Sequence, residues 1–168
     1  MTADELKAML DLKPLPGEGG FFKEIFRAPE MLAKSSLPLR YEDERATMTS
    51  IFYMLDTSTF SAFHRLKSDE IYHFYLGDPV VLSLIDQSGR LTEVTLGKDI
   101  ASGHQLQYVV PKRVWQGSRL APGGNFALMG CTVAPGFEFA DYEHGERRVL
   151  LGDHPLHEEI IVALTRSD

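Results

Sequence analysis

Short segments in which side chains alternate between two faces follow one another along most of the chain. The segment from Phe21 to Arg27 has this period of two, which is typical of a β-strand. Further segments rich in β-branched and aromatic residues, and bounded by Gly, Asp, Ser or Pro, run from Thr47 to Leu55, Phe60 to Leu66, Glu70 to Leu76, Val80 to Asp86, Leu91 to Leu96, Gln105 to Val110 and Phe126 to Val133. Because no helical pattern separates them, they predict an antiparallel meander that forms a sandwich or small barrel.

Helical patterns lie at the two ends. Thr2 and Glu5 have the spacing of a capping box, and a short helix is predicted to follow until the breaker Pro14. The apolar positions of that helix are Leu6, Met9 and Leu10. A second helix is predicted to open at Asp153, with Pro155 near its first turn. Its apolar face consists of Leu156, Ile160, Ile161 and Leu164, and this face is expected to pack on the outside of the barrel.

Two segments near the N-terminus lack periodicity. Residues 14–20 read PLPGEGG and predict a tight turn, in which the glycines supply conformational freedom. The segment from Ala28 to Arg45 is polar, is interrupted by Pro29 and Pro38, and predicts a long surface connection. Ordered loops of this length often border functional sites.

Composition narrows the possible partners. The chain has 168 residues, which suits a single domain spanning residues 1–168. Its net charge is -7, with no basic stripe, which argues against a nucleic-acid partner. No apolar stretch reaches the ~20 residues of a spanning helix, and Asp4 and Glu5 stand where a secretory signal is basic, so no membrane association and a cytoplasmic location are expected. The single cysteine, Cys131, lies in an apolar run and is predicted to be a core residue.

The residue pattern with most chemical content lies between positions 64 and 77. His64, Glu70 and Gly77 have the spacing H-x-H-x3-E-x6-G, except that Leu66 occupies the second histidine position. Side chains two residues apart on a strand point to the same face, so a His-x-His pair can grip one metal ion. Leu66 removes one of those two imidazole donors.

The pattern resembles the first conserved motif of the cupin superfamily. The second motif of that superfamily has a weaker counterpart between Gly103 and Gln116, in which Gln116 takes the position of the histidine and Arg113 that of the glycine. The segments PGEGGFFKE, SAFHRLKSDEIYHFYLGDP, VPKRVWQ and VAPGFEFADY resemble, more narrowly, the cupin group catalogued as a domain of unknown function. The resemblance implies a double-stranded β-helix, the cupin jelly-roll barrel, in a protein that is usually dimeric and whose biochemical role is unassigned.

Strand parity predicts which side chains face the interior of such a barrel. If Glu70 points inward, Tyr72 and Phe74 follow it, and His64 lies on the inner face of its own strand. The predicted pocket also includes Gln116 and, depending on strand register, Tyr53. A few polar groups among aromatic side chains suit a small polar ligand, which the cupin resemblance suggests is sugar-like.

Three functions remain open for this pocket. In a binding module, Tyr53, Phe74 and Gln116 contact the ligand and no reaction follows. In a metal-free sugar epimerase or isomerase, which is the enzyme class favoured here, His64 is the base and Glu70 and Tyr72 are the other catalytic residues. In a metal-dependent enzyme, His64, Glu70 and Gln116 hold a divalent ion, but a neutral amide is a poor ligand and the absence of a cofactor is therefore the favoured expectation.

A homodimer is expected as well. Edge strands and several aromatic side chains need cover, which a second copy across a two-fold axis provides. The candidate contact residues are Phe21, Phe22, Phe26 and Trp115.

Overall fold

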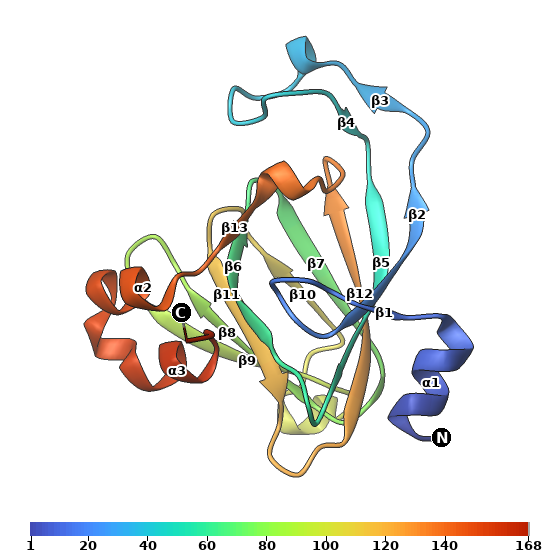
Figure 1. Ribbon diagram of the computed structural model, residues 1–168, viewed down its shortest axis with the longest axis vertical. Coiled ribbons are helices and arrows are strands. Elements are labelled where there is room, and N and C mark those ends of the chain that lie inside the picture. The colour runs from blue at the N-terminus through green and yellow to red at the C-terminus, as the bar shows by residue number, and fades with distance from the viewer. Residues whose placement is uncertain (168) are drawn as a thin grey trace.

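In the computed structural model, which describes residues 1–167, two antiparallel sheets face each other around a narrow interior (Figure 1). One sheet has the order β1 (Lys13–Pro14), β2 (Phe21–Arg27), β5 (Thr49–Asp56), β12 (Phe126–Ala134), β7 (Asp69–Gly77) and β10 (Gln107–Val110). The other has the order β13 (Tyr142–His144), β6 (Ser61–Leu66), β11 (Trp115–Leu120), β8 (Val80–Ile85) and β9 (Leu91–Leu96). The predicted all-β jelly-roll barrel with a helix near each end is confirmed.

The connectivity differs from the predicted meander. β8 and β9 form the expected hairpin, but β12 lies between β5 and β7, and β11 lies between β6 and β8. The strand β11 was not predicted as an element of its own, because its sequence WQGSRL mixes polar residues with a glycine. The turn at residues 67–68 carries the chain from β6 in one sheet to β7 in the other. The two halves of one short sequence motif, with His64 on β6 and Glu70 on β7, therefore lie in opposite sheets of the barrel.

The predicted parity of β7 is confirmed. Glu70, Tyr72 and Phe74 are buried, whereas His73 is only partly buried and Tyr75 is exposed. The inward side chains of both sheets form the main core cluster, which contains Tyr53, Leu55, Tyr72, Phe74, Val80, Leu82, Leu84, Leu96, Val110, Ala127, Met129 and Cys131. Burial of this apolar surface is the main force that holds the sheets together.

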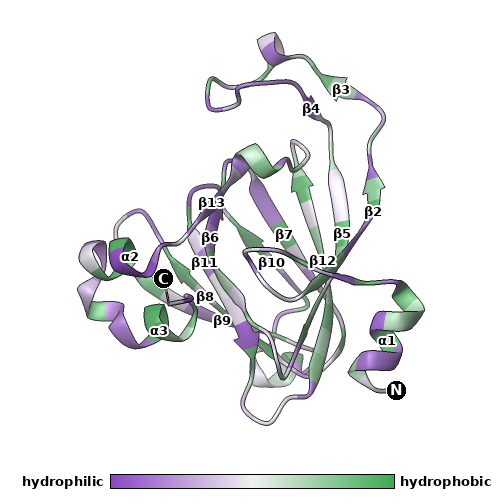
Figure 2. Ribbon diagram, viewed as in Figure 1, coloured by the Kyte–Doolittle hydropathy of each residue, from purple (hydrophilic) through white to green (hydrophobic). Residues whose placement is uncertain are grey.

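The N-terminal helix α1 (Ala3–Leu10) begins with the predicted capping box. The Glu5 backbone N–H donates to Thr2 Oγ1 at 3.2 Å, and the Thr2 backbone N–H donates to Glu5 Oε2 at 2.8 Å. Leu6 is buried as expected, but the prediction for Met9 was wrong, because Met9 is 73% exposed. The helix has only eight residues and carries both hydrophilic and hydrophobic positions (Figure 2), and only Leu6 and Leu10 of its apolar stripe pack against the cluster that contains Met54 and Leu128.

The C-terminal segment folds as α2 (Arg147–Asp153), a 3-10 turn η4 (Pro155–His157) and α3 (Glu158–Ala163). Ile160, Ile161 and Leu164 pack with Trp115 on the outer side of the second sheet, as predicted. Leu156 was wrongly assigned to this face, because it lies in the 3-10 turn before α3 and is 92% exposed. Trp115 is thus covered within one chain and is not free for the dimer contact predicted for it.

The polar segment after β2 forms an arm that extends beyond the barrel (Figure 1). It holds the two-stranded sheet of β3 (Met31–Leu32) and β4 (Arg45–Ala46), with the 3-10 turn η1 (Lys34–Ser36) between them. The predicted surface connection is confirmed for most of this segment. The remaining 3-10 turns are η2 (Ile100–Ser102) and η3 (Phe139–Asp141).

The elements at residues 1–167 include no helix that is both long enough and apolar enough to cross a lipid bilayer.

Candidate functional site

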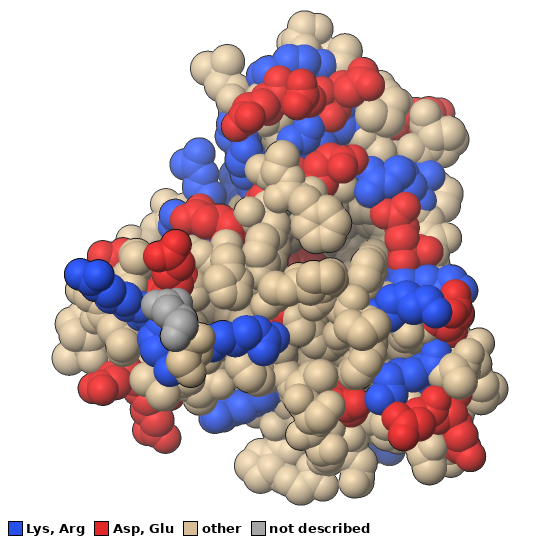
Figure 3. Space-filling model, in the orientation of Figure 1, with Lys and Arg blue, Asp and Glu red and all other residues tan. Residues whose placement is uncertain are grey.

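A cavity of about 110 Å³ opens at one end of the barrel, between the two sheets. The face of the molecule in Figure 3 is hollowed near its centre, and acidic side-chain atoms are visible inside the hollow. The cavity is lined by Leu15, Pro16, Glu18, Phe22, Glu24, Arg27, Thr49, Ile51, His64, Leu66, Glu70, Cys131, Val133, Phe137, Glu138, Phe139 and Tyr142. Its walls are therefore apolar, with a few polar groups pointing inward, which is usual for a small-molecule site.

His64 enters the cavity from β6 and is almost fully buried. Its Nδ1 lies 2.8 Å from the carbonyl oxygen of Ala62, which can only accept, so Nδ1 carries a proton and, in the neutral ring, Nε2 has the free lone pair. Nε2 lies 3.8 Å from Glu18 Oε2, on the cavity side. The imidazole ring stacks on the ring of Tyr142, with centroids 5.2 Å apart. Packing and hydrogen bonding thus fix both the tautomer and the orientation of His64.

Glu70 enters the same cavity from the opposite sheet. Gln116 Nε2 donates a hydrogen bond of 2.7 Å to Glu70 Oε2. Burial raises the pKa of Glu70 to about 7, and the negative charge of Glu18 adds to the rise, whereas a positive charge on His64 and the Gln116 hydrogen bond act in the opposite direction. Glu70 therefore exchanges its proton near neutral pH, as a general acid or base does.

The raised pKa of Glu70 predicts a pH-dependent stability. Between the ordinary pKa of 4.5 and the folded value of about 7, the unfolded chain loses a proton that the folded chain keeps. Stability contributed by the neutral carboxyl is present below the lower value and is lost as the pH rises through the upper one. Relative to Glu70→Gln, the wild type should lose roughly 3 kcal/mol of unfolding free energy between about pH 4 and about pH 8. Urea unfolding of both proteins across this range measures the difference, and a constant difference would contradict the burial of an ionisable Glu70.

Glu18 is a site residue that the sequence analysis missed. The turn at residues 14–20 folds over the barrel mouth, and the Glu18 carbonyl accepts from the Ala62 backbone N–H at 2.8 Å. The side chain points inward, where Ser61 Oγ donates to Glu18 Oε1 at 2.8 Å. The tight turn was predicted correctly, but a turn pattern does not reveal which element lies beneath it. An acidic residue between glycines in an otherwise apolar turn was the available signal.

Two glycines of this turn offer a matched pair of substitutions. Both have positive φ, but a Cβ on Gly20 would lie 2.8 Å from Met54 O and Tyr53 Oη, whereas a Cβ on Gly17 meets nothing within 4 Å. Gly20→Ala should therefore lower the unfolding free energy by about 1–3 kcal/mol more than Gly17→Ala, because both share the left-handed backbone cost and only one is overpacked. Urea unfolding tests this, and equal losses would mean that the turn does not pack on β5.

Other cavity residues were also missed or were given a different role. Cys131 was predicted to be core; it is buried and also lines the cavity, and burial raises the pKa of its thiol well above the ordinary value, with a further contribution from Glu70. At the rim, Arg27 connects β2 to the segment after β12, since its Nη1 lies 2.6 Å from Glu138 Oε1. Phe137 and Phe139 pack edge to face beside it. These residues are far apart in sequence and share no motif.

The structure brings three of the predicted site residues together. His64 and Glu70 line the cavity, and Gln116 lies behind Glu70, directly opposite His64 in the β6–β11 register. Tyr53, Tyr72 and Phe74 lie deeper, in the core cluster, and are not among the lining residues. Tyr53 Oη donates to the Gly19 carbonyl at 2.9 Å, and burial raises the pKa of both Tyr53 and Tyr72 well above the ordinary value. Neither phenol is among the residues that line the cavity.

The donor set does not fit a metal centre of the cupin kind. His64 offers one nitrogen, Leu66 contributes only a hydrocarbon surface, and Gln116 turns its amide nitrogen toward Glu70. Within residues 1–167, no group of three or more His, Cys, Asp or Glu side chains is arranged to hold a metal ion. The cupin motif positions thus supply a single imidazole and one carboxylate, fewer than the three protein ligands of a typical catalytic site.

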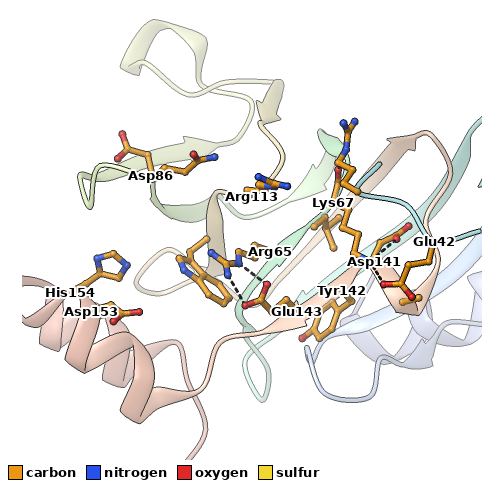
Figure 4. Close-up of a pocket in the computed structure, with 15 residues that line it drawn as sticks. Glu42, Arg65, Lys67, Asp86, Arg113, Asp141, Tyr142, Glu143, Asp153 and His154 are labelled. Carbon is orange, nitrogen blue, oxygen red and sulfur yellow. Dashed lines mark hydrogen bonds and ion pairs between the residues drawn. The ribbon is translucent and has the colours of Figure 1, made fainter. Parts of the chain in front are cut away.

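A second and larger depression, about 780 Å³, lies on the outside of the barrel beside Trp115 (Figure 4). Its charged side chains pair largely with each other. Arg65 Nη2 and Nε lie 2.7 and 2.8 Å from the carboxylate of Glu143, and Lys67 Nζ lies 3.4 Å from Glu42 Oε1 and 3.9 Å from Asp141 Oδ1. This outer groove is open and mostly polar, with Leu66 and Trp115 as its main apolar side chains.

Residues 4–145 match the family model described as Cupin superfamily (DUF985). An uncharacterized protein of Saccharomyces cerevisiae is 30% identical over 135 residues, which are 74% of this chain and 66% of that protein, so the chain spans slightly less than two thirds of this relative. A solved structure from Shewanella oneidensis is 33% identical over 100% of this chain and 99% of its own, with a TM-score of 0.90. A hypothetical protein from Leishmania major is 28% identical over 99% and 100%, with a TM-score of 0.87. Oxalate decarboxylase from Bacillus subtilis shares the fold alone, at 14% identity over 95% of this chain and 38% of its own, with a TM-score of 0.55.

Proposed function

Because this chain belongs to the cupin superfamily, in the group catalogued as DUF985, we propose that it uses the barrel cavity to bind a small polar molecule and to move a proton on one of its carbon atoms without a metal ion. The reaction class is an isomerisation or epimerisation next to a carbonyl group. The observation that carries the proposal is the pair of proton-transfer groups, His64 and Glu70, that enter one cavity from opposite sheets.

The two groups suit opposite roles. His64 Nε2 has a free lone pair and can take a proton from carbon, since Nδ1 is held by the Ala62 carbonyl. Glu70, with a pKa of about 7, is partly protonated at neutral pH and can return a proton to that carbon from the other side. One C–H bond breaks toward Nε2 and a new one forms from the carboxyl O–H, so the configuration at carbon is inverted. Both groups then return to their starting states by exchange with water.

A panel of small hydroxyaldehydes, hydroxyketones and sugars in D₂O tests this proposal. The wild-type protein is expected to exchange the hydrogen next to the carbonyl of at least one compound, seen as loss of its proton NMR signal. Treatment with a chelator should leave the rate unchanged, because no step involves a metal. Line broadening of a compound without any exchange would reject the catalytic part of the proposal and would leave a binding function.

A further inference from the structure

We infer that the cavity selects molecules that donate hydrogen bonds and carry no negative charge, and that it favours a small ammonium group over an alcohol on the same skeleton, and the alcohol over a carboxylate. The inference rests on the proposed binding role of the cavity and names the chemical class of its ligand. It narrows the sugar-like expectation to neutral or cationic compounds.

Acidic side chains outnumber basic ones in the lining of the cavity. Four carboxyl groups line the cavity, and they belong to Glu18, Glu24, Glu70 and Glu138. Among the described residues that line the cavity, Arg27 is the one Lys or Arg. It is already engaged, because Nη1 lies 2.6 Å from Glu138 Oε1, and Nε and Nη2 lie 3.2 and 2.9 Å from the Glu24 carboxylate. No Lys or Arg of the described lining is therefore left to neutralise an anionic ligand.

Hydrogen-bonding capacity points the same way. His64 Nε2 faces the cavity as an acceptor, and Glu18 Oε2 lies 3.8 Å from it, too far for a hydrogen bond between them. Acceptors inside a cavity are costly to leave without a donor, so the space beside His64 Nε2 and Glu18 Oε2 is suited to a ligand or water that brings N–H or O–H groups.

The walls set the size and the remaining shape of the ligand. Leu15, Phe22 and Ile51 give an apolar side, and Phe137 and Tyr142 give aromatic faces. A volume of about 110 Å³ is on the order of one small ring, since a buried cavity of ~150 Å³ holds benzene. An ammonium group beside aromatic faces gains a further cation–π attraction. A ring that carries one short amino or hydroxyl arm is the expected type of ligand.

Benzylamine, benzyl alcohol and benzoate form a matched series of probes with one ring and three charges. The full chain is titrated with each at about pH 8, where the amine is protonated and the acid ionised. Methyl NMR signals of Ile51 and Val133, which line the barrel cavity and not the outer groove, report binding in the cavity. Benzylamine is expected to bind about tenfold or more tightly than benzyl alcohol, because one charge-assisted hydrogen bond contributes about that difference in affinity. Benzoate should not shift these signals.

Glu18→Gln and Glu138→Gln should each reduce the preference for the amine several-fold and leave alcohol binding unchanged. Glu30→Gln, on the exposed part of the arm, is the matched control and should change nothing. Benzoate binding as tightly as benzylamine, equal binding of all three probes, or no shift of the cavity signals with any of them would each overturn the inference.

The outcome is separable from that of the proposed function. Exchange that depends on His64 in an anionic substrate would leave the proposed function standing and remove this inference. If the probes bind in the predicted order but no compound shows His64-dependent exchange, the ligand preference stands and the proposed catalytic function is removed.

Discussion

Replacing His64 with glutamine should slow deuterium exchange into the substrate by about 10²- to 10⁴-fold, the usual contribution of a general base. The imidazole is held by the Ala62 carbonyl and by the ring of Tyr142, so its Nε2 is fixed at the cavity wall. Glutamine keeps a polar group of similar reach but cannot accept a proton. Binding of the substrate should change much less than the exchange rate, because the other cavity residues remain.

His73→Gln is the matched control for this substitution. His73 lies on β7 and faces away from the cavity, where Nε2 lies 3.1 Å from Thr132 Oγ1 and Nδ1 lies 3.0 Å from Gln107 Nε2. Its replacement should leave the exchange rate within about twofold of wild type, since surface changes away from such sites are usually small. Equal rates for wild type and His64→Gln would remove His64 from catalysis.

Asp141→Asn should lower the unfolding free energy by about 3–5 kcal/mol, the largest stability effect expected in the chain. Asp141 and Arg45 are both only 2% exposed, and two hydrogen bonds of 2.7 Å join the carboxylate to Nε and Nη2 of Arg45. Arg45 Nη1 also donates to the carbonyls of Asp43 and Glu44. Without the carboxylate, the guanidinium stays buried and uncompensated at the base of the arm.

An exposed ion pair of similar geometry provides the control. Arg65 and Glu143 also form a two-point contact, but their side chains are 35% and 56% exposed. Glu143→Gln should cost no more than about 1 kcal/mol. The double replacement Arg45→Met with Asp141→Leu should recover most of the loss, because an apolar pair leaves no unpaired buried charge. Urea unfolding measures all of these variants, and a loss below about 1 kcal/mol for Asp141→Asn would show that the arm is not anchored by this pair.

The same pair connects the arm to the cavity. Asp141 lies in η3 and precedes Tyr142, whose ring supports His64. The predicted surface connection from Ala28 to Arg45 did not reveal this pair, because neither residue stands in a recognisable motif and 96 positions separate them.

The strands could be predicted because burial of one face imposes a period of two. Phe21–Arg27 and Leu91–Leu96 were predicted with the bounds that the structure shows. The pairing of the strands could not be predicted in the same way, because each strand of a jelly roll has several possible neighbours that would bury the same apolar face. The predicted meander did not indicate that β6 and β7 lie in opposite sheets, and that placement is what brings His64 and Glu70 into one cavity.

The site could be predicted only as far as the motif extended. His64, Glu70 and Gln116 were found because they occupy aligned motif positions. Tyr53, Tyr72 and Phe74 were expected beside the ligand because strand parity gives the inner face, but parity does not give the depth along the barrel. Those three side chains lie in the packed core. Glu18 reaches the cavity through a turn that crosses the barrel mouth, a tertiary contact with no local signature.

A crystal structure of the wild-type protein with the compound that exchanges most rapidly in D₂O would test most directly whether the barrel cavity is the functional site. The compound is expected in the cavity, with its reactive carbon between His64 Nε2 and the Glu70 carboxyl and its hydrogen-bond donors facing Glu18. Density for the compound in the outer groove beside Trp115 and Arg113, with the barrel cavity empty, would contradict the account.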